Sequence, residues 1–359
     1  MSETGQIDAL RLIRSENVGP VTWHALCQRC GSPGEALRAL PDLAKRGGRR
    51  AAIRVASIAD AEQELAAIAR AGARVVSWGE ADYPAPLGAI PDAPPILILR
   101  GDTRLLHKPT VGLVGARNAS ANGVRIAREM ASSLGEAGIV VASGLARGID
   151  TAAHRGALKT GTIAVLAGGI DIVYPPENKE LQAEIAEQGL IVAEMPPGTV
   201  PQARHFPRRN RIVSGLSLGV IVVEAALRSG SLITARLAGE QGRDVFAVPG
   251  SPLDPRCRGS NNLLREGAIL TESAEDVLRV LEPGTVVRAD PAIRTPVAEI
   301  MVENDMHSLV LERLGPSPIE VDELIRQCGI APGAVMTVLL DLELAGRLAR
   351  QPGNRVNLV

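Results

Sequence analysis

The strongest candidate for chemistry in this 359-residue sequence is the segment 204–211, Arg-His-Phe-Pro-Arg-Arg-Asn-Arg. Its arginines suit phosphate oxygens, because each guanidinium presents a fork of N–H donors, and a base could stack on the phenyl ring. The alternative is a solvated charged face, but such a face seldom runs straight into apolar residues, as this one does after residue 211. We therefore predict a nucleic-acid contact made by Phe206, Arg208, Arg209, Asn210 and Arg211.

Two glycine-containing stretches, 115–120 and 143–148, add positive charge through Arg117 and Arg147. Glycine lets the backbone approach a ligand closely, and the N–H groups of a following helix N-terminus suit an anion such as phosphate. For any single loop, glycine could simply make a tight strand-to-helix turn. Several such loops at one sheet edge, with two arginines, favour an anion site.

The sequence lacks the motifs of three other kinds of site: a nucleotide-binding phosphate loop, a dinucleotide-binding loop and a serine nucleophile. Lys159-Thr160 follows Leu158, so no Walker-type phosphate loop exists, and the stretch 112–115 lacks the dinucleotide-binding glycine spacing. Ser143-Gly144 lacks the flanking residues of a nucleophile elbow.

Three further residues could act as acids or bases. His154 stands alone on a predicted helix, where a structural role is the commoner one. Glu194 and Glu224 end strands at the same edge and could form an acid/base pair, but a sequence does not give their separation.

The spacing of Cys27 and Cys30 is that of a zinc or redox pair, but no second pair of ligands accompanies it. The local pattern is helical, whereas a thiol redox site needs a preceding strand. We interpret the spacing as chance and expect no metal and no cofactor.

From Thr110 onward, fully apolar runs of strand length alternate with helical segments, which is typical of a parallel sheet covered on both faces. The predicted strands are Thr110–Val114, Ile139–Ala142, Thr162–Ala167, Leu190–Glu194, Gly219–Glu224 and Asp244–Val248. The predicted helices between them include Asn122–Glu136, Asp150–Leu158, Lys179–Gln188 and Leu232–Gln241. Ligands of such α/β sheets bind beyond the carboxyl ends of the strands, where the loops described above lie.

We predict three domains and a linker. Residues 1–75 form a small helical domain of the helix-hairpin-helix or SAM-like kind, with helices at Asp8–Arg14, Val21–Cys30 and Ala59–Ala71. Its Asn-Val-Gly-Pro turn could present backbone N–H groups to phosphate, although an accessory bundle is the simpler interpretation. Residues 76–282 form the Rossmann-like domain, in which the Pro-rich segment 82–101 reads as an extended connector. Residues 283–299 are a linker, and residues 300–359 suggest a winged helix.

Composition narrows the function further. The formal net charge of −1 means that any nucleic-acid site must be a local patch, and only 2% of residues are aromatic, too few to stack many bases. The first residues lack the pattern of a signal peptide, and no apolar run reaches the roughly 18 residues of a membrane span. We expect a cytoplasmic protein.

Taken in order, these loops resemble the DNA-processing protein A family (DprA or Smf), bacterial recombination mediators. The resemblance covers about residues 80–280 through an ordered set of motifs. They are Val114-Gly115-Ala116-Arg117 with Ser120, Ser143-Gly144-Leu145-Ala146-Arg147-Gly148-Ile149-Asp150 with His154, Gly168-Gly169-Ile170-Asp171, Tyr174-Pro175, Asn178-Lys179, Phe206-Pro207-Arg208-Arg209-Asn210-Arg211-Ile212, Ser229 to Ala235, Val248-Pro249-Gly250 and Gly267-Ala268.

The resemblance implies a Rossmann-like core that binds single-stranded DNA as a homodimer, contacts the RecA recombinase and loads it during natural transformation, without catalysis. Carried over residue by residue, it implies a DNA site of Arg117, Arg147, Lys179 and Arg209-Asn210-Arg211, lined by Gly115, Ser120, Ser143, Gly144, Gly148, Ser229, Gly230 and Thr234.

Two other functions remain open. The core resembles nucleotide phosphoribohydrolases more distantly, but residues 229–235 lack the paired glycines and the Glu of their catalytic loop. A nucleotide-sensing scaffold would instead bind mononucleotides tightly.

The C-terminal domain departs from a DNA reader. Residues 301–359 hold five arginines against eight carboxylates, a net charge of −3, and the candidate recognition helix Ala334–Leu344 has Asp341 and Glu343 but no Lys or Arg. That sign opposes a DNA groove. We predict a protein-contact role, and deletion of residues 300–359 should leave DNA affinity almost unchanged.

Overall fold

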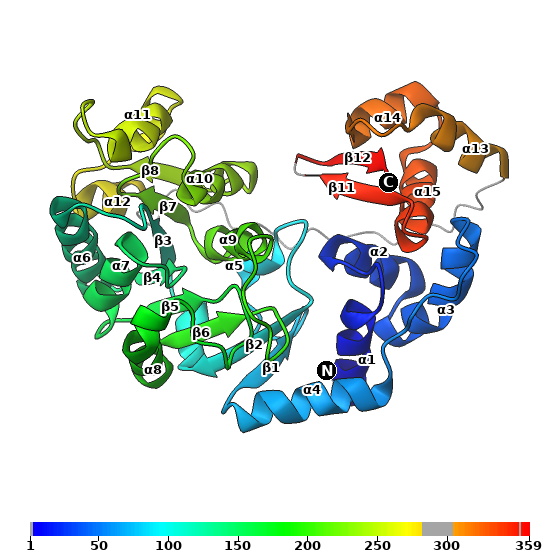
Figure 1. Ribbon diagram of the computed structural model, residues 1–359, viewed down its shortest axis with the longest axis horizontal. Helices are drawn as coiled ribbons and strands as arrows, with labels where there is room; N and C mark the ends of the chain where they lie inside the picture. Colours follow the sequence, from blue (N-terminus) through cyan, green and yellow to red (C-terminus); the bar gives the residue numbers. More distant parts are fainter. Residues whose placement is uncertain (1–2, 282–303, 352) are drawn as a thin grey trace. The chain divides into compact units, whose positions relative to one another are not determined.

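The computed structural model describes residues 3–281, 304–351 and 353–359, and the chain divides into two compact units (Figure 1). One unit joins the two ends of the chain, Met1–Gln63 with Ala292–Val359, and the other spans Glu64–Pro291. The predicted linker at 283–299 lies outside the described residues.

The larger unit is built on a nine-stranded sheet with the order β1-β2-β6-β5-β4-β3-β7-β8-β9. The strands are β1 (Arg74–Ser77), β2 (Ile96–Gly101), β3 (Thr110–Val114), β4 (Val140–Ser143), β5 (Thr162–Val165), β6 (Leu190–Ala193), β7 (Gly219–Val222), β8 (Asp244–Ala247) and β9 (Ile269–Leu270). In the order of the sheet, the seven strands from β6 through β5, β4, β3, β7 and β8 to β9 all pair in parallel. Strand β2 pairs antiparallel with both β1 and β6.

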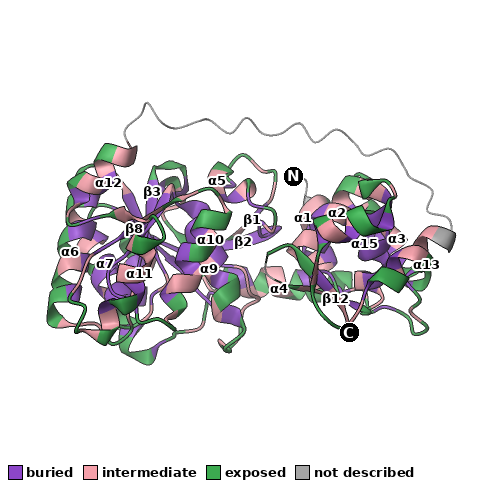
Figure 2. Ribbon diagram, turned by 90° about the horizontal axis from the view of Figure 1, so that it is seen from above, coloured by how far each residue is buried: buried purple, intermediate pink, exposed green. Residues whose placement is uncertain are grey.

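Helices cover both faces of this sheet. One face packs against α6 (Ala121–Glu136), α7 (Ile149–Ala157), α8 (Lys179–Gln188) and α12 (Ala274–Leu281). The other packs against α5 (Ala85–Gly88), α9 (His205–Leu216) and α10 (Gly230–Glu240), while α11 (Arg258–Arg265) follows β8. Every residue of β3 to β7 is buried, which explains why these strands are apolar throughout. Figure 2, coloured by burial, shows β3 in purple.

The predicted Rossmann-like sheet is confirmed, and the six predicted strands all occur with ends within two residues. The prediction was wrong at the Pro-rich segment 82–101. It forms α5 and β2 rather than a connector, because the apolar run from Ile96 completes the sheet edge beside β6. Helix α9, which carries the arginine-rich segment, was also not predicted.

The smaller unit contains two helical modules. At the N-terminal end, α1 (Glu3–Arg14), α2 (Pro20–Cys30) and α3 (Pro33–Arg46) pack together, and α4 (Ile58–Arg70) leads out of the unit. The tight turn between α1 and α2 places Asn17 in the left-handed region at φ 59°. Buried Trp23 fixes α2 to α1 by donating its indole N–H to the carbonyl of Ala9 at 3.2 Å.

The C-terminal module is a winged helix, as predicted. It consists of α13 (Asn304–Arg313), β10 (Ile319–Glu320), α14 (Val321–Cys328), α15 (Pro332–Leu344), β11 (Leu348–Gln351) and β12 (Arg355–Leu358), with the antiparallel order β10-β12-β11. Its core gathers Val310, Leu324, Val335, Leu339 and Val356. Across the described ranges, no single helix combines the length and apolar character of a membrane span; α14 and α15 reach that threshold only as a pair bent by 118°.

Candidate nucleic-acid interface

The exposed part of the predicted site begins in the loop between β3 and α6. Arg117 is exposed there, and its guanidinium carbon lies 5.0 Å from the ring centroid of Phe206, within cation–π range. Phe206 comes from the first turn of α9, and its other ring neighbour is Tyr174, at 5.7 Å between centroids and tilted by 52°. Tyr174 is 42% exposed. Three segments far apart in sequence thus form a cationic and aromatic surface.

Glycine 148 brings the loop after β4 against the loop after β3. It has φ +76°, and a Cβ atom there would stand 2.3 Å from the carbonyl oxygen of Ala116. The N–H of Ile149 donates to the same carbonyl at 3.2 Å. The close approach requires glycine, because the same Cβ atom would also stand 2.8 Å from the carbonyl oxygen of Arg117.

The peptide groups on either side of Gly144 are held between opposite charges. One carboxylate oxygen of Asp150 accepts the N–H groups of Gly144 and Ala146, at 3.1 and 3.2 Å. The guanidinium of Arg209 donates to the carbonyl of Gly144 and to the carbonyl of Val165. Both charged side chains are buried, at 6% exposure, so their hydrogen bonds hold the loop after β4 in place.

Burial shapes the ionisation of this pair. Burial raises the pKa of Asp150, although the nearby Arg209 guanidinium lowers it. Burial likewise lowers the pKa of Arg209 to about 10, against the raising effect of Asp150. Each charge therefore compensates the other, and removing one would leave the other buried without its main counter-charge.

The guanidinium of Arg211 also makes its contacts within the protein. Its guanidinium pairs with Glu194 at 2.5 Å, donates to the Asp92 carbonyl and lies 3.4 Å from the Asp92 carboxylate. Burial would lower the pKa of Arg211, but the two carboxylates raise it above its ordinary value. The side chain is 6% exposed, so it braces α9 against the segment before β2 rather than facing solvent.

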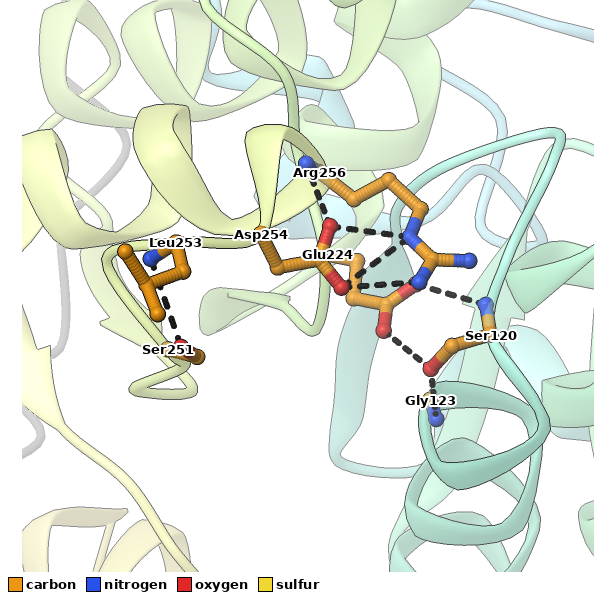
Figure 3. A network of polar contacts seen from close by, with 7 residues as sticks. All are labelled: Ser120, Gly123, Glu224, Ser251, Leu253, Asp254 and Arg256. Carbon is orange, nitrogen blue, oxygen red and sulfur yellow. Dashed lines mark hydrogen bonds and ion pairs between the residues drawn. The ribbon is translucent and has the colours of Figure 1, made fainter.

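Ser120 belongs to a carboxylate-centred network shown in Figure 3. Its hydroxyl caps α6 by accepting the N–H of Gly123 at 2.9 Å and donates to Glu224 at 2.5 Å, while its own N–H donates to the same carboxylate. Arg256 lies close to this carboxylate and pairs with Asp254 at 2.8 Å. The pKa of Arg256 is raised by Asp254 first and by Glu224 to a smaller degree.

The smaller polar residues of the predicted site mostly serve the fold. Ser143 is fully buried and donates to the Leu113 carbonyl at 2.6 Å, and Thr234 is 2% exposed. Ser229 caps α10, exposed Gly230 opens that helix, and Asn210 donates to the Gly230 carbonyl at 3.3 Å. These contacts set the shape of the strand-end loops.

Four cations of the predicted site face solvent: Arg117, Arg147, Lys179 and Arg208. Arg147 is 62% exposed and lies 3.6 Å from Glu177, two residues before Lys179 at the start of α8. Arg117 contacts Phe206, and Arg208 follows on the same helix. The structure thus separates the predicted residues into an exposed cationic group and a buried set that positions it.

Two contributors, Tyr174 and Asp150, occur in the family motifs quoted above but were not predicted as site residues. Tyr174 is one of only six aromatic residues in the chain and sits in a loop, which was a usable signal. Asp150 follows the Gly148 turn at the start of α7, a position typical of a carboxylate that binds loop N–H groups.

The candidate acids and bases all have structural partners. Glu194 pairs with Arg211, and Glu224 binds Ser120. His154 is fully buried, and burial followed by the charge of Arg209 lowers its pKa to about 3.

Cys27 and Cys30 both lie on α2, in agreement with the predicted helical pattern. Burial and the neighbouring Cys30 raise the pKa of Cys27 to about 12. Among the residues that the structure describes, no three His, Cys, Asp or Glu side chains gather closely enough to hold a metal ion.

Fold and site together define a Rossmann-like α/β protein with a cationic and aromatic surface at the strand-end loops; the same chain also contains a helix-hairpin-helix module and a winged helix. Residues 74–282 match the profile of the family described as DNA recombination-mediator protein A. Residues 3–67 match a DprA-like N-terminal HHH domain, and residues 294–354 match a DprA winged helix domain. The chain belongs to the DNA recombination-mediator protein A family.

Curated relatives and solved structures agree. Protein Smf of Escherichia coli is 41% identical over 290 residues, covering 77% of this chain and 75% of the relative. The DNA processing protein DprA of Streptococcus pneumoniae is 49% identical over 202 residues, 56% of this chain and 71% of the relative. The X-ray structure of the S. pneumoniae protein matches with a TM-score of 0.65 at 37% identity, over 77% of this chain and 98% of that one.

A structure from Helicobacter pylori, solved to describe its single-stranded DNA binding mode, matches with a TM-score of 0.54 at 32% identity. The match covers 58% of this chain and 95% of that one.

Proposed function

We propose that this protein binds single-stranded DNA, without chemistry on it, at the surface formed by Arg117, Arg147, Lys179, Phe206 and Tyr174. The observation that carries the proposal is the Arg117 guanidinium over the Phe206 ring, with the Tyr174 ring 5.7 Å from the same ring. Cations beside stacking rings suit a backbone phosphate next to an unpaired base. The single-stranded DNA binding of the H. pylori relative supports the same ligand.

In this proposal, Arg209 and Arg211 position the site rather than contact DNA. Their donors are directed at Gly144, Val165 and Glu194, so little capacity is left for phosphate. The exposed cations supply the charge, and little base preference follows, because phosphate contacts carry no sequence information.

Titration of a labelled oligonucleotide tests the site. The strand should be about 20 nucleotides long, exceeding the ~4–16 nucleotides that one binding module covers. Arg117→Ala should weaken single-strand binding about 10–100-fold, since a charged hydrogen bond contributes ~1.5–3 kcal/mol. Arg128→Ala removes another exposed arginine, from α6, and should have no effect. Full affinity in both Arg117→Ala and Lys179→Ala would show that the site lies elsewhere.

We further propose that the DNA-bound protein acts as a homodimer that loads RecA during natural transformation. Membership of a recombination-mediator family supports the role, and Leu253 and Leu270, 90% and 54% exposed, offer apolar surface for a second copy. Sedimentation equilibrium should give twice the mass of one chain. RecA assembly on DNA covered by single-strand-binding protein should accelerate with the wild type and fail to accelerate with Arg117→Ala.

The alternative, a nucleotide-processing enzyme, predicts release of free base from nucleoside monophosphates. The burial of His154 and the pairing of Glu194 and Glu224 favour binding over hydrolysis. Chromatography of the incubated nucleotides distinguishes the two functions.

A further inference from the structure

In the unit formed by the two ends of the chain, the winged helix packs through α15 against α2 and α3. Arg29 Nη1 lies 3.5 Å from Asp341 Oδ1, and Asn17 donates its side-chain N–H to the Leu344 carbonyl at 3.1 Å. Arg347 donates to the Gly47 carbonyl at 3.4 Å. Helix α15 occupies the position of the helix that enters the DNA groove in a winged-helix protein, and here it contacts α2 and α3 of the same chain.

The fit is closest at Gly47. A Cβ atom there would stand 1.9 Å from the carbonyl oxygen of Asp341 and 2.9 Å from the Cβ of Ala345. Gly47 has an ordinary φ of −68°, so its backbone conformation would accept alanine. The absence of a side chain is needed only because α15 approaches so closely.

The two modules have complementary charges. Residues 1–57 contain nine Lys and Arg against five Asp and Glu, a net charge of +4, whereas residues 301–359 have a net charge of −3. Opposite net charge favours this packing and guides its orientation.

Asp341 concentrates this complementarity. It is 4% exposed although it is a carboxylate, and burial raises its pKa while Arg29, Arg46 and His307 lower it. A buried carboxylate needs such cationic neighbours. It presents to Arg29 and Arg46 the negatively charged oxygens that a phosphate would present.

The turn between α1 and α2 lies beside this contact. Its Asn17, in the left-handed conformation, touches the end of α15. We propose that the face formed by Asn17, Arg29 and Arg46 binds the phosphate backbone of duplex DNA, and that the acidic winged helix occupies this face as an internal competitor. This second DNA site is separate from the strand-end surface proposed above.

The test uses the full chain carrying Arg117→Ala and Lys179→Ala, so that the strand-end surface contributes little. Gly47→Ala is added as a wedge that alters no charge, and Gly239→Ala is the matched control, because a Cβ there meets nothing within 4 Å. Hydrogen exchange of the α15 amides reports undocking, with α14 as the reference for the winged-helix fold. Fluorescence anisotropy with a labelled duplex reports binding.

We expect Gly47→Ala to increase exchange in α15 and to raise duplex affinity about tenfold, the factor expected when the free face is about a tenth of the population beforehand. Adding Arg29→Ala and Arg46→Ala should abolish the gain. Should Gly47→Ala fail to fold, Asp341→Asn keeps the shape, removes the charge and should raise affinity several-fold. On this proposal, deleting residues 300–359 also raises duplex affinity rather than leaving DNA affinity unchanged.

Three results would overturn the proposal. Increased exchange in α15 without tighter duplex binding would make the contact purely structural. A gain in affinity that survives loss of Arg29 and Arg46 would place the DNA elsewhere. No change in either measurement would mean that α15 does not rest on Gly47.

Discussion

Replacing Arg209 with alanine should destabilise the α/β unit far more than it weakens any direct DNA contact. The change leaves Asp150 as a buried charge without its counter-charge and leaves two carbonyls, of Gly144 and Val165, without their donor. Breaking a buried charge pair costs about 3–5 kcal/mol, a third or more of the ~5–15 kcal/mol that stabilises a typical domain. With an m-value near 3 kcal/mol/M, the urea midpoint should fall by about 1–2 M.

The chain offers a clean probe for this measurement. It has two tryptophans, and Trp78 lies in the α/β unit whereas Trp23 lies in the other. In a Trp23→Phe background, Trp78 fluorescence therefore reports the unfolding of the α/β unit alone.

Arg208→Ala is the matched control, because Arg208 is exposed on the same helix, and surface substitutions shift stability by only about 0.5 kcal/mol. Adding Asp150→Asn to Arg209→Ala should recover part of the loss, since no isolated buried charge then remains. The reasoning would be refuted if Arg209→Ala kept the wild-type midpoint yet lost DNA binding, because Arg209 would then act as a DNA contact.

Three further outcomes are expected. Gly144→Ala should lower both stability and DNA affinity, because its Cβ would overlap the Arg209 guanidinium; an unchanged urea midpoint would contradict the contact. Thr162 donates its hydroxyl proton to the Val141 carbonyl, so the Nδ1 of neutral His154 donates to the Thr162 hydroxyl and its Nε2 has no proton. The pKa of His154 is about 3 in the folded protein and ~6.5 in the unfolded chain. The stability that His154 contributes is therefore present above pH ~6.5 and is lost as the pH falls. Between pH 7 and pH 5 the Trp78-monitored free energy of unfolding should fall by about 2 kcal/mol, a slope that His154→Leu should remove. Log–log plots of single-strand affinity against salt should have a slope near −3, at ~0.7 for each of about four phosphate contacts, and a slope near zero would contradict a phosphate-binding surface.

Much of the fold was predictable because strands buried on both faces carry a strong local pattern. The apolar runs that form β3 to β7 could be recognised locally, since every residue in them is buried and apolar or small. Strand β2 was missed because prolines before Ile96 suggested a connector, and its place beside β6 depends on a partner nearly a hundred residues away.

The location of the site could be predicted from the sequence, but which of its arginines are exposed and which are buried could not. Arg208 and Arg209 are neighbours of the same type, yet one is exposed and the other is buried. The difference comes from acceptors 65 and 44 residues away, which no local pattern reveals. Helix α9 was missed because its first half buries polar side chains, whereas its buried apolar residues begin only at Ile212.

The joining of the two chain ends in one unit has a consequence for biosynthesis. The helical module that carries Gly47 leaves the ribosome first, whereas α15, which covers it, is made nearly three hundred residues later. At ~5–20 residues per second, the interval is about 15–60 s. Each nascent chain thus presents the uncovered basic face of its first module until its last segment emerges, which makes translation itself a period in which that face is open.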